Sequence, residues 1–188
     1  MSKHYLYGEY IDMGKYQDIV ERAIDNYGIV TSAEATAMGV ALKDICEWVS
    51  NGRLEKVGRG VYRLSQFPMN ELCHYAEAVA LVGKGSWIWG ESVLAMHDLA
   101  LVNPLYTFVA TTKRVRRNLP KWIKVVKVDS DADRDSFDGI PCQNIASVFI
   151  EAKGRIMFER LVQAVKEARN RGLLAVDENA RIKKELKI

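Results

Sequence analysis

The chain has 188 residues, of which 48% are hydrophobic and 27% charged, and its formal net charge is +3. Such a chain can bury one or two apolar cores, and its composition excludes a disordered protein. It has no apolar run long enough to span a membrane and no secretory pattern at its start, so we expect a cytoplasmic protein. Its 3 cysteines lack metal-ligand spacing and are expected to be reduced, buried thiols.

The first elements are two helices. Apolar residues at helical spacing predict a helix over about Lys15 to Tyr27 that ends at Gly28, with one apolar face made of Tyr16, Ile19, Val20, Ala23, Ile24 and Tyr27. Thr31, followed three residues later by Glu34, is typical of a capping box and predicts a helix over Ser32 to Met38. Gly39 is expected to end it.

A third helix is predicted over about Ala41 to Asn51, and Gly52 ends it. Its spacing predicts an inward stripe of Leu42, Ile45, Cys46 and Val49, with Trp48 at the flank. The outward residues are then Ala41, Lys43, Asp44, Glu47, Ser50 and Asn51.

A hairpin follows, made of Leu54 to Val57, the turn Gly58-Arg59-Gly60, and Val61 to Leu64. The two glycines are expected to take the positive φ that a tight turn requires. Three helices followed by such a hairpin predict a winged helix-turn-helix domain over residues 1–65. This topology serves DNA binding, and it also serves as a protein-interaction module.

The charge pattern indicates where this domain would touch DNA. Residues 1–69 carry eight basic and nine acidic side chains, but four of the basic ones lie in or beside the hairpin. Local field, more than net charge, determines phosphate contact. The candidate DNA-binding residues are Lys43, Ser50 and Asn51 on the third helix and Arg53, Lys56, Arg59 and Arg63 in the hairpin and its approach.

Residues 66–69, which include Pro68, are expected to link this domain to a second one over residues 70–188. The second domain is predicted to be mixed α+β. Its expected elements are a helix from Asn70, a short strand leading into a helix over Glu91 to Leu99, strands over Leu105–Thr111 and Trp122–Val128, a helix or strand over Asn144–Ala152, a helix over Arg155–Arg171 with Phe158 inward, and a last helix capped by Asp177. The fold class is therefore α+β.

Three stretches together resemble the AbiEi antitoxins of type IV toxin–antitoxin, or abortive-infection, systems. They are GRLEKVGRGVYRL (52–64), WIWGESVLAMHDLAL (87–101) and DGIPCQNIASVFIEA (138–152). The resemblance spans nearly the whole chain. It implies an N-terminal winged domain that represses its own operon by binding inverted repeats in the promoter. It also implies a C-terminal domain that counteracts a nucleotidyltransferase-like toxin without forming a stable complex with it, and no enzymatic activity.

A basic run stands out in the second domain. Seven cations and no acid occur among fifteen residues: Lys113, Arg114, Arg116, Arg117, Lys121, Lys124 and Lys127. One interpretation is a solvated sheet edge that its charge protects against aggregation. The other is a second phosphate-binding surface, for DNA or for an RNA substrate of the toxin.

Two further patterns suggest metal chemistry. The alternating aspartates at 129, 131, 133, 135 and 138 fail the EF-hand pattern because Arg134 and Ile140 occupy its strictest positions. Asp138, Glu151 and Lys153 resemble the PD-(D/E)xK nucleases, which makes a Mg²⁺-dependent nuclease the alternative from another class. His97 is expected to be partly buried and structural. We expect no catalytic residue, metal site or cofactor.

Overall fold

The computed structural model describes the backbone of residues 3–188 and the side chains of residues 14–188. It divides into two compact units, Met1–Leu81 and Val82–Ile188, which are described separately below. The last helix of the first unit begins at Cys73, after the predicted linker at 66–69. Within the described residues, no helix is long and apolar enough to cross a bilayer.

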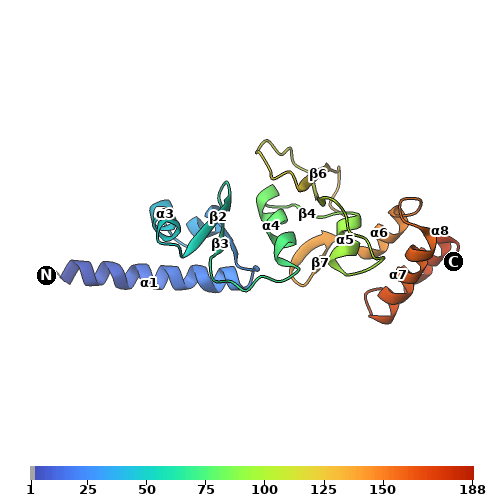
Figure 1. The fold of residues 1–188 in the computed structure, drawn as a ribbon, viewed down its shortest axis with the longest axis horizontal. Coiled ribbons are helices and arrows are strands. Elements are labelled where there is room, and N and C mark those ends of the chain that lie inside the picture. The colour runs from blue at the N-terminus through green and yellow to red at the C-terminus, as the bar shows by residue number, and fades with distance from the viewer. Residues whose placement is uncertain (1–2) are drawn as a thin grey trace. The chain divides into compact units, whose positions relative to one another are not determined.

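The first unit combines helices with a three-stranded antiparallel sheet in the order β1-β3-β2. Helix α3 and the hairpin lie on the same side of α1 (Figure 1). This is the winged helix-turn-helix arrangement that the sequence predicts. The elements are α1 (Lys3–Ile24), β1 (Ile29–Thr31), α2 (Ser32–Ala37), α3 (Leu42–Ser50), β2 (Leu54–Gly58), β3 (Val61–Leu64) and α4 (Cys73–Val82).

Helix α1 begins earlier and ends sooner than the predicted span of Lys15 to Tyr27. It ends because Tyr27 and Gly28 take positive φ values of 55° and 77°, while the amide of Gly28 donates to the carbonyl of Ala23 at 2.7 Å. A side chain at position 28 would also meet the ring of Phe67, since a Cβ there would lie 2.5 Å from its Cγ. Glycine is therefore required at this turn.

The capping box at the start of α2 is present as predicted. The amide of Glu34 donates to Thr31 Oγ1 at 3.2 Å, and the amide of Thr31 donates to Glu34 Oε2 at 2.9 Å. Arg22 of α1 pairs with the same carboxylate. Partial burial acts to raise the pKa of Glu34, but hydrogen bonds from Arg22 and Thr31 outweigh it and lower that pKa. The cap thus also joins α2 to α1.

The core of the first unit is centred on Trp48, which is fully buried and meets Tyr16 edge-on with ring centroids 5.1 Å apart. The predicted position of Trp48 at the flank of its helix is therefore wrong. The predicted inward position of Ile24 is also wrong, because this residue is exposed. The other buried core residues are Ile19, Ala23, Val30, Ala35, Val40, Ile45, Leu54, Tyr62 and Leu64.

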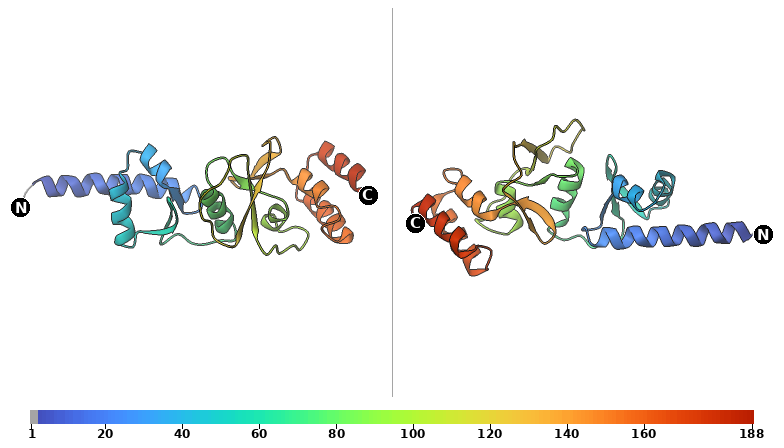
Figure 2. Two further views of the ribbon diagram at one scale, coloured as in Figure 1. Left: turned by 90° about the horizontal axis from the view of Figure 1, so that it is seen from above. Right: turned by 180° about the vertical axis from the view of Figure 1, so that it is seen from behind.

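The second unit is a mixed five-stranded sheet, in the order β6-β5-β4-β8-β7, with helices. Strands β5 and β6 pair in parallel, as do β4 and β8, whereas the other two pairs are antiparallel. Helices α7 and α8 lie together at one end of the unit (Figure 2). Its elements are β4 (Trp87–Ile88), α5 (Glu91–Met96), β5 (Thr107–Thr111), β6 (Ile123–Lys127), β7 (Arg134–Phe137), β8 (Ile140–Gln143), α6 (Ile145–Glu151), α7 (Phe158–Asn170) and α8 (Val176–Leu186).

These elements confirm the α+β class and resolve the open choice at Asn144–Ala152, which is helical. Asn144 caps α6, because its side chain accepts from the amides of Ala146 and Ser147. Two details of the prediction were wrong. Phe158 is 48% exposed because it begins α7, ahead of the inward stripe around Leu161. Helix α8 is capped at Ala175, whose amide donates to Glu178, and not by Asp177.

Candidate nucleic-acid interface

The outward face of α3 is the surface that a winged domain offers to a DNA groove. Ile45 and Trp48 point into the core, which turns Lys43, Cys46 and Glu47 outward. The predicted inward stripe was wrong for two of its members: Leu42 is 59% exposed, and Cys46 is exposed. The helix is rotated from that prediction because the large indole takes the central inward position.

At the end of α3, polar side chains are engaged locally. The hydroxyl of Ser50 donates to the carbonyl of Glu47 at 2.8 Å. Asn51 Oδ1 accepts from the amide of Arg53 at 3.3 Å. Both residues are exposed, and their hydrogen-bonded geometry holds them at the helix terminus. Lys43 is the one cation within α3, since Lys15, which pairs with Asp44 at 3.8 Å, comes from α1.

The wing is a two-stranded hairpin over the predicted residues, and its register places Leu54 opposite Leu64, with a bulge between Lys56 and Gly58. The prediction that both turn glycines have positive φ was wrong. Gly60 does, at 71°, whereas Gly58 has no positive φ; a Cβ at Gly58 would lie 2.2 Å from Leu81 Cδ2 and would require the end of that side chain to move. The turn leaves Arg59 exposed, and Lys56 is exposed on β2.

Arg63 has a different environment from the other wing cations. Its guanidinium donates to Glu55 at 2.7 Å and to Glu77 of α4 at 3.0 Å. Burial raises the pKa of Glu77, while Arg63 lowers it and Glu55 raises it further. With two carboxylates beside it, Arg63 ties β3 to α4, and its charge is largely neutralised locally. Glu77 was not among the predicted site residues, and its position near the start of the next helix, α4, is the only sign of it in the sequence.

Arg53 lies over the ring of Tyr16, with its Cζ 5.0 Å from the ring centroid. This cation–π contact holds the guanidinium at the junction of α1 and the wing while leaving the residue exposed. Of the seven predicted DNA-binding residues, Lys43, Lys56 and Arg59 are therefore the exposed cations with neither an ion pair nor a cation–π contact among the described residues. DNA contact by all seven stays a prediction.

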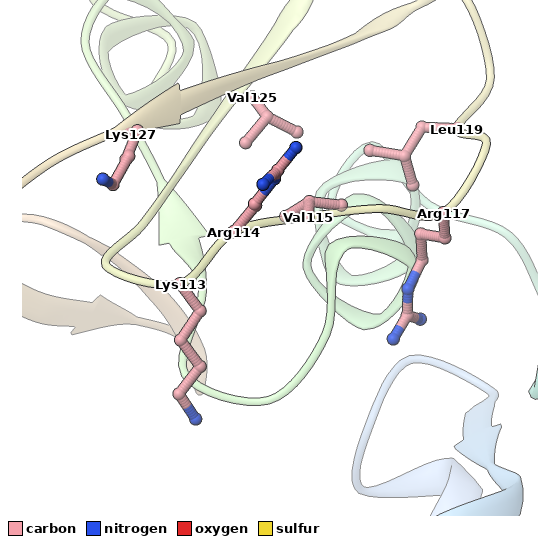
Figure 3. Close-up of a pocket in the computed structure, with 7 residues that line it drawn as sticks. All are labelled: Lys113, Arg114, Val115, Arg117, Leu119, Val125 and Lys127. Atoms are coloured by element: carbon pink, nitrogen blue, oxygen red, sulfur yellow. The ribbon is translucent and has the colours of Figure 1, made fainter.

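The basic run of the second unit occupies the loop between β5 and β6 and strand β6 itself (Figure 3). Lys124 lies over the ring of Tyr106, 4.5 Å from its centroid. Arg116 and Lys121 are exposed. The remaining four cations, Lys113, Arg114, Arg117 and Lys127, line a cavity of about 310 Å³.

The residues of the nuclease-like pattern are held by local contacts. Glu151, at the end of α6, accepts from Gln143 Nε2 at 3.0 Å. Lys153 donates to the carbonyl of Glu185 at 2.7 Å. Among the residues whose side chains are described, no group of three or more histidine, cysteine or carboxylate side chains is arranged to hold a metal ion. The side chains of Glu151 and Lys153 therefore both have structural contacts.

His97 is 6% exposed, and its ring packs on that of Phe137 with centroids 3.9 Å apart. Burial, helped by the positive charge of Arg171, lowers the pKa of His97 to about 4, although Asp135 acts in the opposite direction. The backbone carbonyl of His97 accepts from Arg171 at 2.7 Å. A neutral, packed imidazole fits the predicted structural role.

Trp87 is also buried, at 1% exposed.

The helices, the three-stranded sheet and the exposed wing define the first unit as a winged helix-turn-helix domain. Residues 17–65 match the family described as "Transcriptional regulator, AbiEi antitoxin". The chain thus carries an AbiEi antitoxin domain at its N-terminal side, as its sequence motifs suggest. A family of transcriptional regulators implies DNA binding by this domain. No curated protein matches this chain.

Proposed function

We propose that this chain is the antitoxin and transcriptional autorepressor of a type IV toxin–antitoxin operon. Its winged domain binds inverted repeats in its own promoter. Its second unit counteracts a nucleotidyltransferase-like toxin without a stable complex. The observation that carries the proposal is the match of residues 17–65 to AbiEi regulators over a domain whose α3 face and wing cations are exposed.

Docking follows from the chemistry of the two elements. Helix α3 offers an outward face around Cys46 that also includes Leu42, Lys43, Glu47 and Ser50. An α-helix fits the major groove, where such side chains reach the edges of the bases. The wing offers Lys56 and Arg59, whose long cationic side chains reach phosphates on the flanking backbone. Few side chains of α3 can form hydrogen bonds with base edges. We therefore assign much of the affinity for DNA to the phosphate contacts of the wing.

The direct test is binding to duplex DNA taken from immediately upstream of the gene. A scrambled duplex of the same length and composition is the control. Specific recognition predicts affinity tighter by about a thousandfold or more for the upstream duplex at physiological salt. Fluorescence anisotropy measures both. Equal, weak binding to the two duplexes would instead identify the domain as a protein-interaction module.

Cys46 provides a second test, because a thiol on the outward face of α3 would be covered in the complex. Cys46 is exposed, whereas Cys73 and Cys142 are buried. Burial, with a contribution from Asp135, also raises the pKa of Cys142 to about 12. We therefore expect N-ethylmaleimide to label the free protein once, at Cys46, since reaction requires an accessible thiolate.

Upstream DNA at one hundred times its Kd should slow this labelling by about a hundredfold, because mass action leaves only about 1% of the protein free. Intact-mass spectrometry follows the reaction, and Cys46→Ser provides the unlabelled control. Unchanged labelling in the presence of saturating DNA would show that α3 does not face the groove.

The second unit is assigned the antitoxin role because the family match ends at residue 65 and leaves that unit outside the regulator domain. The second unit also contains the basic run from Lys113 to Lys127, with seven positively charged side chains and no acidic one. A surface of this sign attracts phosphate-bearing molecules over several ångströms. If the second unit acts on a substrate that it shares with the toxin, no stable complex with the toxin is needed, as the proposal states.

A further inference from the structure

The cavity in the second unit has a lining of two chemical kinds. It lies between the loop that joins β5 to β6 and strand β6, and its volume is about 310 Å³. Figure 3 shows Arg114 extending from the loop toward Val125 on the strand, with Leu119 on another side. The lining consists of four cations, Lys113, Arg114, Arg117 and Lys127, and three aliphatic side chains, Val115, Leu119 and Val125.

Three of the four positive charges of this lining have no ion pair to compensate them among the described residues. No carboxylate contributes to the lining. Among the described residues, Lys113, Arg114 and Lys127 form no ion pair, in contrast to Arg63, which has two. Cations around one space repel each other, and a ligand with several negative charges would remove that repulsion. A polyphosphate meets this requirement, and an arginine fork is suited to its oxygens.

The aliphatic part of the lining narrows the class of ligand. Val125 is 37% exposed, although valine on a strand is usually covered on at least one face. Val115 and Leu119 are half-buried beside it. A purely inorganic anion gains nothing from these side chains, whereas a ligand with a flat, apolar part gains about 25 cal/mol for each Å² that it covers. We propose that the cavity binds a nucleoside polyphosphate, with its phosphates on Arg114 and the lysines and its base against Leu119 and Val125.

Two features favour a mononucleotide over a nucleic-acid strand. Surfaces that bind single strands stack successive bases on aromatic rings, and no aromatic side chain lines this cavity. The volume is at the lower end of the range for small-molecule sites, which is about 300–1,000 Å³. A strand would instead run along the whole basic run and use Arg116 and Lys121, which lie outside the lining. The roles of these two residues therefore separate the alternatives.

The experiment is isothermal titration of the full chain with ATP, inorganic triphosphate and a fifteen-nucleotide dT strand. Arg114→Ala should weaken ATP binding about tenfold, the effect of losing a charge-assisted hydrogen bond. Leu119→Ala should weaken ATP several-fold and leave triphosphate binding unchanged. Arg116→Ala and Lys121→Ala remove the same charge from the same run outside the cavity, and should change the ATP affinity less than twofold. Circular dichroism checks that each variant is folded.

Three outcomes would overturn the proposal. The first is no saturable binding of ATP. The second is an equal loss in Arg114→Ala and Arg116→Ala, which would indicate only the general field of the run. The third is tighter binding of the dT strand, weakened alike by all the charge variants, which would make this surface a nucleic-acid contact. Lys127→Ala repeats the Arg114→Ala titration with a lining cation on strand β6. The result then does not depend on one loop residue.

Discussion

Replacing Trp48 with alanine is expected to lower the free energy of unfolding of the first unit by about 3–5 kcal/mol. The side chain is 0% exposed and contacts the ring of Tyr16. Its indole Nε1 is buried without a hydrogen-bond partner among the described residues, so the loss comes from packing and from the cavity left behind. Such a change is a large part of the stability of a domain of this size.

Urea unfolding followed by far-ultraviolet circular dichroism measures this effect, and Leu42→Ala is the matched control. Both residues are on α3, but Leu42 is 59% exposed. Its truncation should change the free energy of unfolding by less than about 0.5 kcal/mol. The opposite order, with Leu42→Ala the more damaging change, would show that α3 is rotated as the apolar stripe of the sequence predicts.

The double substitution Lys56→Ala and Arg59→Ala is expected to weaken binding to the upstream DNA by a factor of about a hundred or more. Each residue is an exposed cation without an ion-pair partner among the described residues, and each is assigned one phosphate contact. A charge-assisted hydrogen bond contributes about 1.5–3 kcal/mol. Losing two phosphate contacts should also reduce the slope of log K against log salt by about two.

Two single substitutions calibrate this measurement. Lys166→Ala removes an exposed lysine on α7 and should leave both the affinity and the slope unchanged. Arg63→Ala should lower stability, because it leaves Glu77 partly buried beside Glu55 without its cation, but it should leave the salt slope nearly unchanged. A slope that falls with Arg63→Ala and not with the double substitution would contradict the placement of the phosphate contacts.

The same double variant separates the two proposed functions of the chain. If the wing serves only the promoter, cells that express the toxin should be rescued by the double variant as well as by the unchanged protein. Growth after induction of the toxin, with both proteins expressed from an unrelated promoter, measures this. Loss of rescue at equal protein level would show that the wing itself takes part in neutralising the toxin.

Local chemistry explains why so much of the first unit could be predicted. The capping box of Thr31 and Glu34, the turn at Gly60 and the hairpin over residues 54–64 depend on residues close together in sequence. Such interactions have the same geometry in any fold that contains them. The secondary structure of the second unit was harder to predict, because a short apolar segment such as 145–151 fits a strand or a helix equally well until its neighbours are known.

Sequence alone thus determined the winged domain, the α+β class and the location of the two basic segments. Tertiary structure decided which of those charges are available. It turned Cys46 outward and Trp48 inward, because the core accepts the largest ring at its centre. It also placed Glu77 against Arg63 and gathered Arg114, Leu119 and Val125 around one cavity. Ion pairing and shared cavities depend on side chains from separate elements, and only the packed chain brings those elements together.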